Sequence, residues 1–244
     1  MHRYWIGLLL IANLGCGSPS GPRSGSVVLS SIESGSTNGH QFGAAFLEAD
    51  IEDVVTSRYP TCTVPASAGD CYMLDCPAEP PPFFSAGTIT ASVAGTELLS
   101  ATPNSAGIYT VIDSGPAFGA GQVVSFAASG ADVPAFTGSV TGPETPATTL
   151  PTTIPSTVDL VVSWPPSIAA EDVTLGIVSM DAVLLCRAPA SQGSITVASN
   201  LLTAFGTGNI GLSVAGANST RVTAGAYTID LSAQARAHTT AVIE

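Results

Sequence analysis

The chain has 244 residues, of which 18 are acidic and only 6 are basic, so its formal charge is −12. All 6 basic residues are arginine. Hydrophobic residues make up 45% of the chain and charged residues 10%, which excludes a disordered chain because such chains are rich in charge and poor in apolar residues. An acidic chain without a basic cluster lacks the charges that neutralise phosphates, which excludes nucleic acid as a partner.

The N-terminus is typical of an export signal. Arg3 precedes an apolar run over residues 4–14, and Gly15 and Cys16 follow it directly. The run is shorter than the roughly 18 residues that a transmembrane helix needs. We therefore expect residues 1–15 to be a signal peptide that is removed on export.

Gly15-Cys16 after an apolar run resembles the lipobox of bacterial lipoproteins. The resemblance implies that Cys16 is the lipid attachment site and the first residue of the mature chain, which places the protein in the cell envelope. The residue after Cys16 is not Asp, as in lipoproteins sent to the outer membrane. Ordinary secretion is the alternative, with Gly15 and Gly17 before a cut at Ser18, and it would give a secreted or periplasmic protein.

Residues 16–26 are mostly Ser, Gly and Pro. Small residues of this kind predict a flexible tether between the lipid and the folded part of the chain.

The remaining cysteines predict disulfides. With Cys16 carrying lipid, Cys62, Cys71, Cys76 and Cys186 are left in an oxidising compartment, which predicts two bridges. The first three could pair once among themselves and leave one member for Cys186, but three connectivities remain open. The gaps differ from those of zinc motifs and no histidine is close, so we expect no metal and no cofactor.

Most of residues 86–236 consists of short runs that alternate apolar and polar residues between turn residues, which predicts β-strands. Two short helices are expected at 51–58 and 200–205, the second ended by Gly206. Many short strands without intervening helices predict an all-β fold of antiparallel sheets. The expected strands are 88–93, 107–113, 122–128, 135–141, 158–164, 172–179, 182–188, 194–198, 210–215 and 227–234. In the last of these, one face is expected to carry Tyr227, Ile229, Leu231 and Ala233, and the opposite face Thr228, Asp230, Ser232 and Gln234.

The segment 143–156 is rich in Pro and Thr and does not alternate, which predicts an extended linker. It divides the mature chain into residues 27–142, which include the Cys-rich loop, and residues 157–244. Each part is near the size of an Ig-like domain of about 100 residues, so we expect two tandem Ig-like β-sandwich domains. The alternative is one larger sandwich in which this segment is a crossover loop. A chain with an export signal that ends in a cysteine, a Cys-rich early region and β-strands on both sides of a Pro/Thr-rich linker is similar to uncharacterised β-sandwich lipoproteins of bacteria.

Motifs for catalysis are absent from the sequence. His40 and His238 are the only histidines beyond the signal, and neither lies in a motif. The chain has no Gly-x-Ser-x-Gly elbow, no His-Glu-x-x-His pair and no glycine-rich phosphate loop. We therefore name no catalytic residue and expect a protein that is not an enzyme.

The densest acidic cluster contains Glu48, Asp50, Glu52 and Asp53. These carboxylates are a weak candidate for a calcium site, because calcium takes six to eight oxygen ligands. The loop glycine and the spacing of an EF-hand are missing, so a solvated acidic face is the preferred interpretation.

Aromatic residues are the remaining candidates for binding. Trp164 follows Leu160 and Val162 in an alternating row, which predicts that it lies in a core. Phe83 and Phe84 follow a run of three prolines, and we expect them to form an exposed loop that binds a ligand.

These observations favour an exported, lipid-anchored cell-envelope protein that acts as a non-catalytic binding or adhesion module. Its expected partners are the membrane, through the lipid, and a protein or glycan at the cell surface. The alternatives are a purely structural envelope lipoprotein and, less favoured, a secreted hydrolase with two carboxylates across a cleft.

Overall fold

The computed structural model describes residues 23–34, 37–47, 63–75, 83–114, 117–179 and 182–244. Apart from the 3-10 turn η1 (Ala190–Gln192) and the short helix α2 (Ser199–Phe205), the regular structure in these ranges is β-strand, which confirms the all-β prediction. None of the helices in the described ranges has the length and hydropathy needed to cross a membrane.

The strands of the described ranges form three sheets. The ten-stranded sheet contains, in spatial order, β3 (Thr63–Ala68), β4 (Cys71–Asp75), β13 (Val183–Pro189), β12 (Asp172–Val178), β15 (Gly208–Ala224), β16 (Tyr227–Ile243), β1 (Arg23–Ser34), β2 (Thr37–Leu47) and β7 (Tyr109–Ser114), with β10 (Thr153–Ile154) also on β16. The four-stranded sheet has the order β6 (Thr96–Ala101), β5 (Ile89–Val93), β8 (Val123–Ala128) and β9 (Phe136–Thr141). The two-stranded sheet pairs β11 (Leu160–Ser163) with β14 (Ser194–Val197). All pairs are antiparallel except those that β16 makes with β1 and β10.

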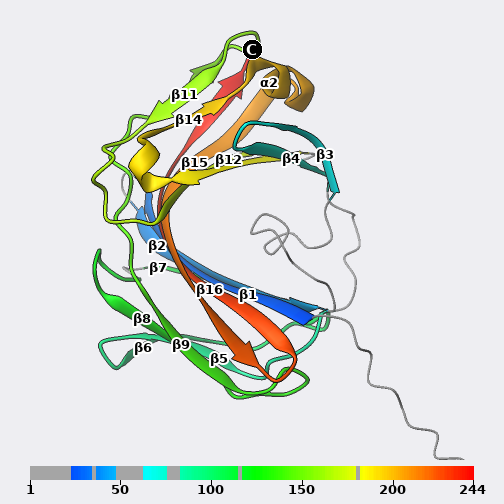
Figure 1. The fold of residues 1–244 in the computed structure, drawn as a ribbon, viewed down its shortest axis with the longest axis vertical. Helices are drawn as coiled ribbons and strands as arrows, with labels where there is room; N and C mark the ends of the chain where they lie inside the picture. The colour runs from blue at the N-terminus through cyan, green and yellow to red at the C-terminus, as the bar shows by residue number, and fades with distance from the viewer. Residues whose placement is uncertain (1–22, 35–36, 48–62, 76–82, 115–116, 180–181) are drawn as a thin grey trace, which may run out of the picture.

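The hairpin β15–β16 runs through the whole molecule. Each of its strands has 17 residues, and they pair continuously from Gly208 opposite Ile243 to Ala224 opposite Tyr227. Figure 1 shows this hairpin arching from α2, β11 and β14 at one end to β5, β8 and β9 at the other. Both smaller sheets lie on the outer side of the arch. The ten-stranded sheet is therefore bent, and its other face is concave.

Two hydrophobic cores lie on the outer side of the bent sheet. The first core is formed with the four-stranded sheet and contains Phe42, Phe46, Phe126 and the predicted row that begins at Tyr227. The second core is formed with β11, β14 and α2. Trp164 is 4% exposed in the second core, where its indole N–H donates to the carbonyl of Ala190 at 2.7 Å, so the predicted core position is confirmed. Each core is a sandwich of two sheets.

The cores do not follow the expected tandem division at 143–156. Cys71 belongs to the second core although it precedes this segment, and Tyr227 belongs to the first core although it follows it. Because β15 and β16 each supply residues to both cores, the two sandwiches share one hairpin and are interleaved in sequence.

The segment 143–156 is packed against the fold and does not form a free linker. Ile154 in β10 is 1% exposed and belongs to the second core. The N–H of Glu144 donates to the carbonyl of Ala169 at 3.0 Å. A Cβ atom on Gly216 of β15 would lie 2.2 Å from the carbonyl oxygen of Glu144, so the segment crosses the hairpin where the hairpin has no side chain.

The predicted tether is too long at its C-terminal end. Residues 23–26 lie in β1 and pair in parallel with β16, and Ser24 and Ser26 are buried. A Cβ atom on Gly25 would lie 2.3 Å from the ring of Phe46. Glycine is therefore required at position 25, because the Phe46 ring occupies the space beside the strand there. Residues 16–22 of the predicted tether lie outside the described residues.

The helix α2 matches the prediction at 200–205, and Gly206 ends it with a φ of 94°. The N-cap is Ala198, whose side chain makes no capping hydrogen bond. A carboxylate from elsewhere in the chain takes the capping role, because Asp159 Oδ1 accepts from the N–H of Ser199 at 2.7 Å. These hydrogen bonds from Ser199 lower the pKa of Asp159. The helix predicted at 51–58 lies outside the described residues.

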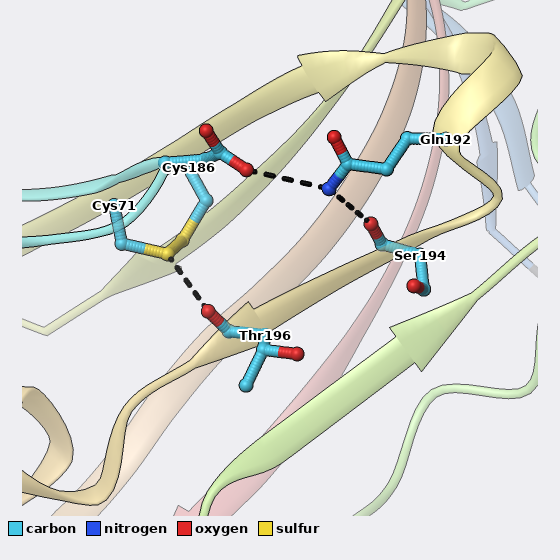
Figure 2. Close-up of a disulfide and its surroundings, with 6 residues drawn as sticks. Cys71, Cys186, Gln192, Ser194 and Thr196 are labelled. Carbon is cyan, nitrogen blue, oxygen red and sulfur yellow. Dashed lines mark hydrogen bonds between the residues drawn. A yellow bond between two sulfur atoms is a disulfide. The ribbon is translucent and has the colours of Figure 1, made fainter.

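A disulfide joins two neighbouring strands of the second core. Cys71 on β4 and Cys186 on β13 are register partners, with 4.0 Å between their Cα atoms. Figure 2 shows the bridge beside β14, where Gln192 Nε2 donates to the carbonyl of Ser194 at 3.0 Å. One of the predicted bridges is thus assigned. Cys62 and Cys76 lie outside the described residues, and the second bridge stays a prediction.

Candidate functional site

The concave face of the ten-stranded sheet differs in chemistry from its outer face. On β16 the odd-numbered residues Tyr227 to Ala235 pack into the first core, and the alternation of a strand turns the even-numbered residues to the concave face. On β1 the core residues Val27 and Leu29 alternate in the same way with Ser26, Val28 and Ser30. The concave face is therefore built from the positions between the core residues.

Five buried polar side chains lie together on this face, and we call them the polar seam. Its members are 1–8% exposed and come from the parallel pair β1–β16: Ser24, Ser26, Ser30, Ser232 and Gln234. In register, Ser30 lies opposite Gln234, and Val28 lies opposite Ser232. Burial of polar groups in place of apolar ones costs free energy unless hydrogen bonds replace those lost to water. Such a row on one face of a sheet is a candidate binding surface.

A groove of about 310 Å³ opens over the polar seam. Its floor is formed by β1, β2 and β16, and one wall is formed by residues 108–110 at the start of β7. The lining residues are Ser26, Val28, Ser30, Gln41, Gly43, Ala44, Ala45, Ile108, Tyr109, Thr110, Gln234 and Arg236. A second groove of about 250 Å³ shares Gln41 and Arg236 with the first and continues over β12 and β15 towards His238.

Gln234 is the most buried member of the polar seam, with 1% of its surface exposed. Its Oε1 atom accepts hydrogen bonds from Ser30 Oγ at 3.2 Å and from Arg236 Nη2 at 3.0 Å. Its Nε2 atom is buried and has no hydrogen-bond partner in the described structure. Buried donors without a partner are rare in native proteins and call for an explanation.

Arginine is concentrated on the concave face in the described part of the chain. Arg187 on β13 forms an ion pair with Asp172, and Arg221 on β15 forms one with Asp230 at 2.8 Å. The hydrogen bond and charge of Asp230 raise the pKa of Arg221 above its usual value. Among the described residues that line the first groove, Arg236 is the only charged one. In a chain of formal charge −12, this groove thus carries a positive side chain.

The fold does not bring His40 and His238, the two histidines beyond the signal, close to each other. His40 is 5% exposed on β2, where it lies on the same strand face as Phe42 of the first core. His238 is exposed on the concave side and lines the second groove. Since they lie on opposite faces of the sheet, they do not form one site.

Metal ligands do not cluster in the part of the chain that the structure describes: no group of three His, Cys, Asp or Glu side chains there could hold an ion. The predicted acidic cluster Glu48, Asp50, Glu52 and Asp53 lies outside the described residues, as does the lipid attachment site Cys16.

Phe83 and Phe84 are half-buried, although the sequence led us to expect an exposed loop. The Phe84 ring packs against the first core and meets the Tyr227 ring edge-on, with 6.2 Å between centroids. The guanidinium of Arg23 lies 5.7 Å from the Phe84 ring centre. The N–H of Phe84 donates to the carbonyl of Phe46 at 2.8 Å. Phe84 therefore contributes to packing, on the side of the sheet away from the groove.

Sequence reasoning placed two of the five residues of the polar seam on the correct face and missed the other three. The alternation at 227–234 correctly set Ser232 and Gln234 on the face opposite the core residues. The seam residues of β1 fall in the predicted tether or outside any predicted strand. The signal that could have found them is the alternation of Ser26, Val28 and Ser30 with the apolar Val27 and Leu29.

Comparisons with known proteins add little to this geometry. No family model and no curated protein matches the chain. Among solved structures, the chain is similar to the FN1–FN3 domains of chicken CNTN1, at 10% sequence identity and a TM-score of 0.21, with 79% of this chain and 74% of that chain covered. The function is therefore inferred from the residues of the chain itself.

Proposed function

We propose that the protein is an exported, lipid-anchored protein of the cell envelope, and that it binds a ligand without catalysis in the groove over the polar seam. The buried, unpartnered Nε2 of Gln234 at this groove carries the proposal. A sheet face with only a structural role is better served by apolar or fully hydrogen-bonded side chains, because a buried donor without an acceptor costs about 1–3 kcal/mol. A ligand with an acceptor group would remove that cost.

The lipobox-like Gly15-Cys16 supports export with a lipid anchor. The Cys71–Cys186 disulfide supports an oxidising compartment, because such bonds persist mainly in exported proteins. On this proposal the lipid holds the protein at the outer membrane, and the groove faces a protein or glycan at the cell surface.

The intact mass of the native protein tests the anchor. The protein is extracted with detergent from its own cells, and free thiols are alkylated without reduction. A chain that begins at Cys16, carries acyl mass and takes up no alkyl group is expected. An unlipidated chain that begins further on contradicts the anchor and favours a secreted product.

Amide chemical shifts test the groove. The protein is titrated with a panel of small peptides and saccharides, and shifts are expected to concentrate in β1, β2 and β16. Shifts that concentrate instead around Phe83 and Phe84 would support the ligand-binding loop that the sequence predicts. The absence of any saturable shift would contradict a binding function and leave a purely structural role.

A further inference from the structure

We propose that the groove over the polar seam binds a small organic carboxylate, with Gln234 Nε2 and the Arg236 guanidinium as its hydrogen-bond donors. This inference rests on the proposed function, because it assigns a ligand class to the same groove.

The orientation of the Gln234 amide shows which group the ligand must offer. Its oxygen already accepts from two donors, Ser30 Oγ and Arg236 Nη2. Rotating the amide by half a turn would place its NH₂ group against the Arg236 guanidinium, which has no acceptor, so this contact fixes the nitrogen on the other side. The unsatisfied atom is therefore a donor, and the ligand must present an acceptor.

The charge of the groove shows what kind of acceptor is favoured. Among the described lining residues, Arg236 is charged and none is acidic. A guanidinium and a neighbouring amide N–H suit a carboxylate, which has two acceptor oxygens and a negative charge, and charge-assisted hydrogen bonds are about twice as strong as neutral ones. A neutral carbonyl or hydroxyl would satisfy Gln234 but would gain less from Arg236.

The size and the walls of the groove limit the rest of the ligand. A volume of about 310 Å³ is at the lower end of the range for small-molecule sites, which is about 300–1,000 Å³. Val28, Ala45 and Ile108 give an apolar surface beside the seam, and Ser26 and Gln41 add hydrogen-bonding groups. The groove thus fits a molecule the size of a dipeptide or a sugar acid. The carboxylate is the chemistry that these two sources share.

Two matched pairs of probes distinguish the sources and test the carboxylate. One pair is N-acetyl-Ala-Ala and its C-terminal amide, and the other is glucuronate and glucose. Binding to the full chain is measured by calorimetry and by amide chemical shifts. We expect at least one acid to bind at least tenfold more tightly than its neutral partner, with shifts at the polar seam.

The variant Gln234→Glu tests the assigned donor. Glutamate keeps the oxygen that accepts from Ser30 and Arg236 but replaces the amide donor with a second acceptor that repels a carboxylate. Binding of the acid is expected to fall at least tenfold. The matched control is Gln122→Glu, which adds the same charge in an exposed turn where Oε1 accepts from the N–H of Gly119 at 2.6 Å. This control is expected to bind the acid as the wild type does.

A second variant, Arg236→Gln, tests the charge even if Gln234→Glu does not fold. It is expected to reduce the preference for each acid over its neutral partner to less than threefold. Equal binding of acid and neutral probes to the wild-type groove would overturn the carboxylate while leaving the binding function in place. No binding of any of these probes at the polar seam would overturn the carboxylate. The binding function as well would be contradicted only if no member of the wider peptide and saccharide panel gave a saturable shift.

Discussion

The two faces of the ten-stranded sheet are both buried around β1 and β16, but they are buried by different chemistry. On the outer face, Phe42, Tyr227 and Ile229 are at most 1% exposed and pack against a second sheet. On the concave face, Ser30 and Gln234 are only 3% and 1% exposed but are polar. The difference teaches that burial alone does not identify a core. The outer face stabilises the protein through packing, whereas the concave face buries polar side chains, which cost free energy unless hydrogen bonds replace those lost to water.

The largest effect is expected from Phe46→Ala on the outer face. The Phe46 ring is fully buried and lies between the rings of Tyr109 and Phe136, at centroid distances of 6.1 and 5.9 Å. Its removal leaves a cavity, and the free energy of unfolding should fall by about 3–5 kcal/mol in a denaturant titration. Val123→Ala, at a half-exposed position of β8, is the control and should change it by less than about 0.5 kcal/mol. Similar losses for both variants would contradict the assignment of the effect to the burial of Phe46 in the outer-face core.

The next largest effect is expected from loss of the Cys71–Cys186 disulfide. The bridge spans 115 residues and joins β4 to the second core, so the double variant Cys71→Ala, Cys186→Ala should lose about 2–5 kcal/mol. Hydrogen exchange should rise first in β4 and β13 and less around Phe46. Uniform acceleration across both cores would show that the bridge constrains the whole chain and not one sandwich.

A smaller effect on stability is expected on the concave face. Gln234→Leu removes the unpartnered amide nitrogen but also takes the acceptor from Ser30 and Arg236, so the two consequences oppose each other. We expect a loss of about 1 kcal/mol, well below that of Phe46→Ala. A loss above about 3 kcal/mol would mean that the polar seam is needed for folding and would weaken its assignment as a binding surface.

The smallest effect concerns the edge of the second core, at Asp159. The hydrogen bonds from Ser199 favour the charged form and lower the pKa of Asp159 in the folded protein. A group with a depressed pKa adds stability above its unfolded value of 3.8, and that stability is lost as the pH falls through the lower folded value. Asp159→Asn should therefore lose a little stability at neutral pH, and should differ less from the wild type in strong acid. Thermal unfolding of the variant and the wild type, at neutral pH and in strong acid, measures this difference in stability.

The sequence predicted the outer face better than the concave one, and the reason is physical. Alternation identifies which residues share a face, so the row from Tyr227 to Ala233 and the position of Trp164 were predicted correctly. It does not show what lies against each face, so the groove could not be recognised before β1 was placed beside β16. The β1 strand itself was missed because its Ser and Gly residues resemble a tether.

The length of the hairpin was underestimated for a related reason. The strand expected at 210–215 continues to Ala224 through Gly216, Ala217 and Asn218, which have the composition of a turn. These small residues lie at the bend, where the crossing segment leaves no room for a side chain on Gly216. A contact from a distant segment set the requirement for glycine there, and local sequence does not reveal such a contact.

The position of β16 has a consequence for the order in which the protein can fold. The last strand of the chain lies between β15 and β1, supplies Tyr227 to the first core and Ile243 to the second, and pairs in parallel with residues far earlier in the chain, as with Arg23 opposite Tyr227. Neither sandwich can close before the 17 residues of β16 have been synthesised. Both sandwiches therefore depend on pairing between distant parts of the sequence, and such pairing forms slowly because the long loop between the two strands must be closed first.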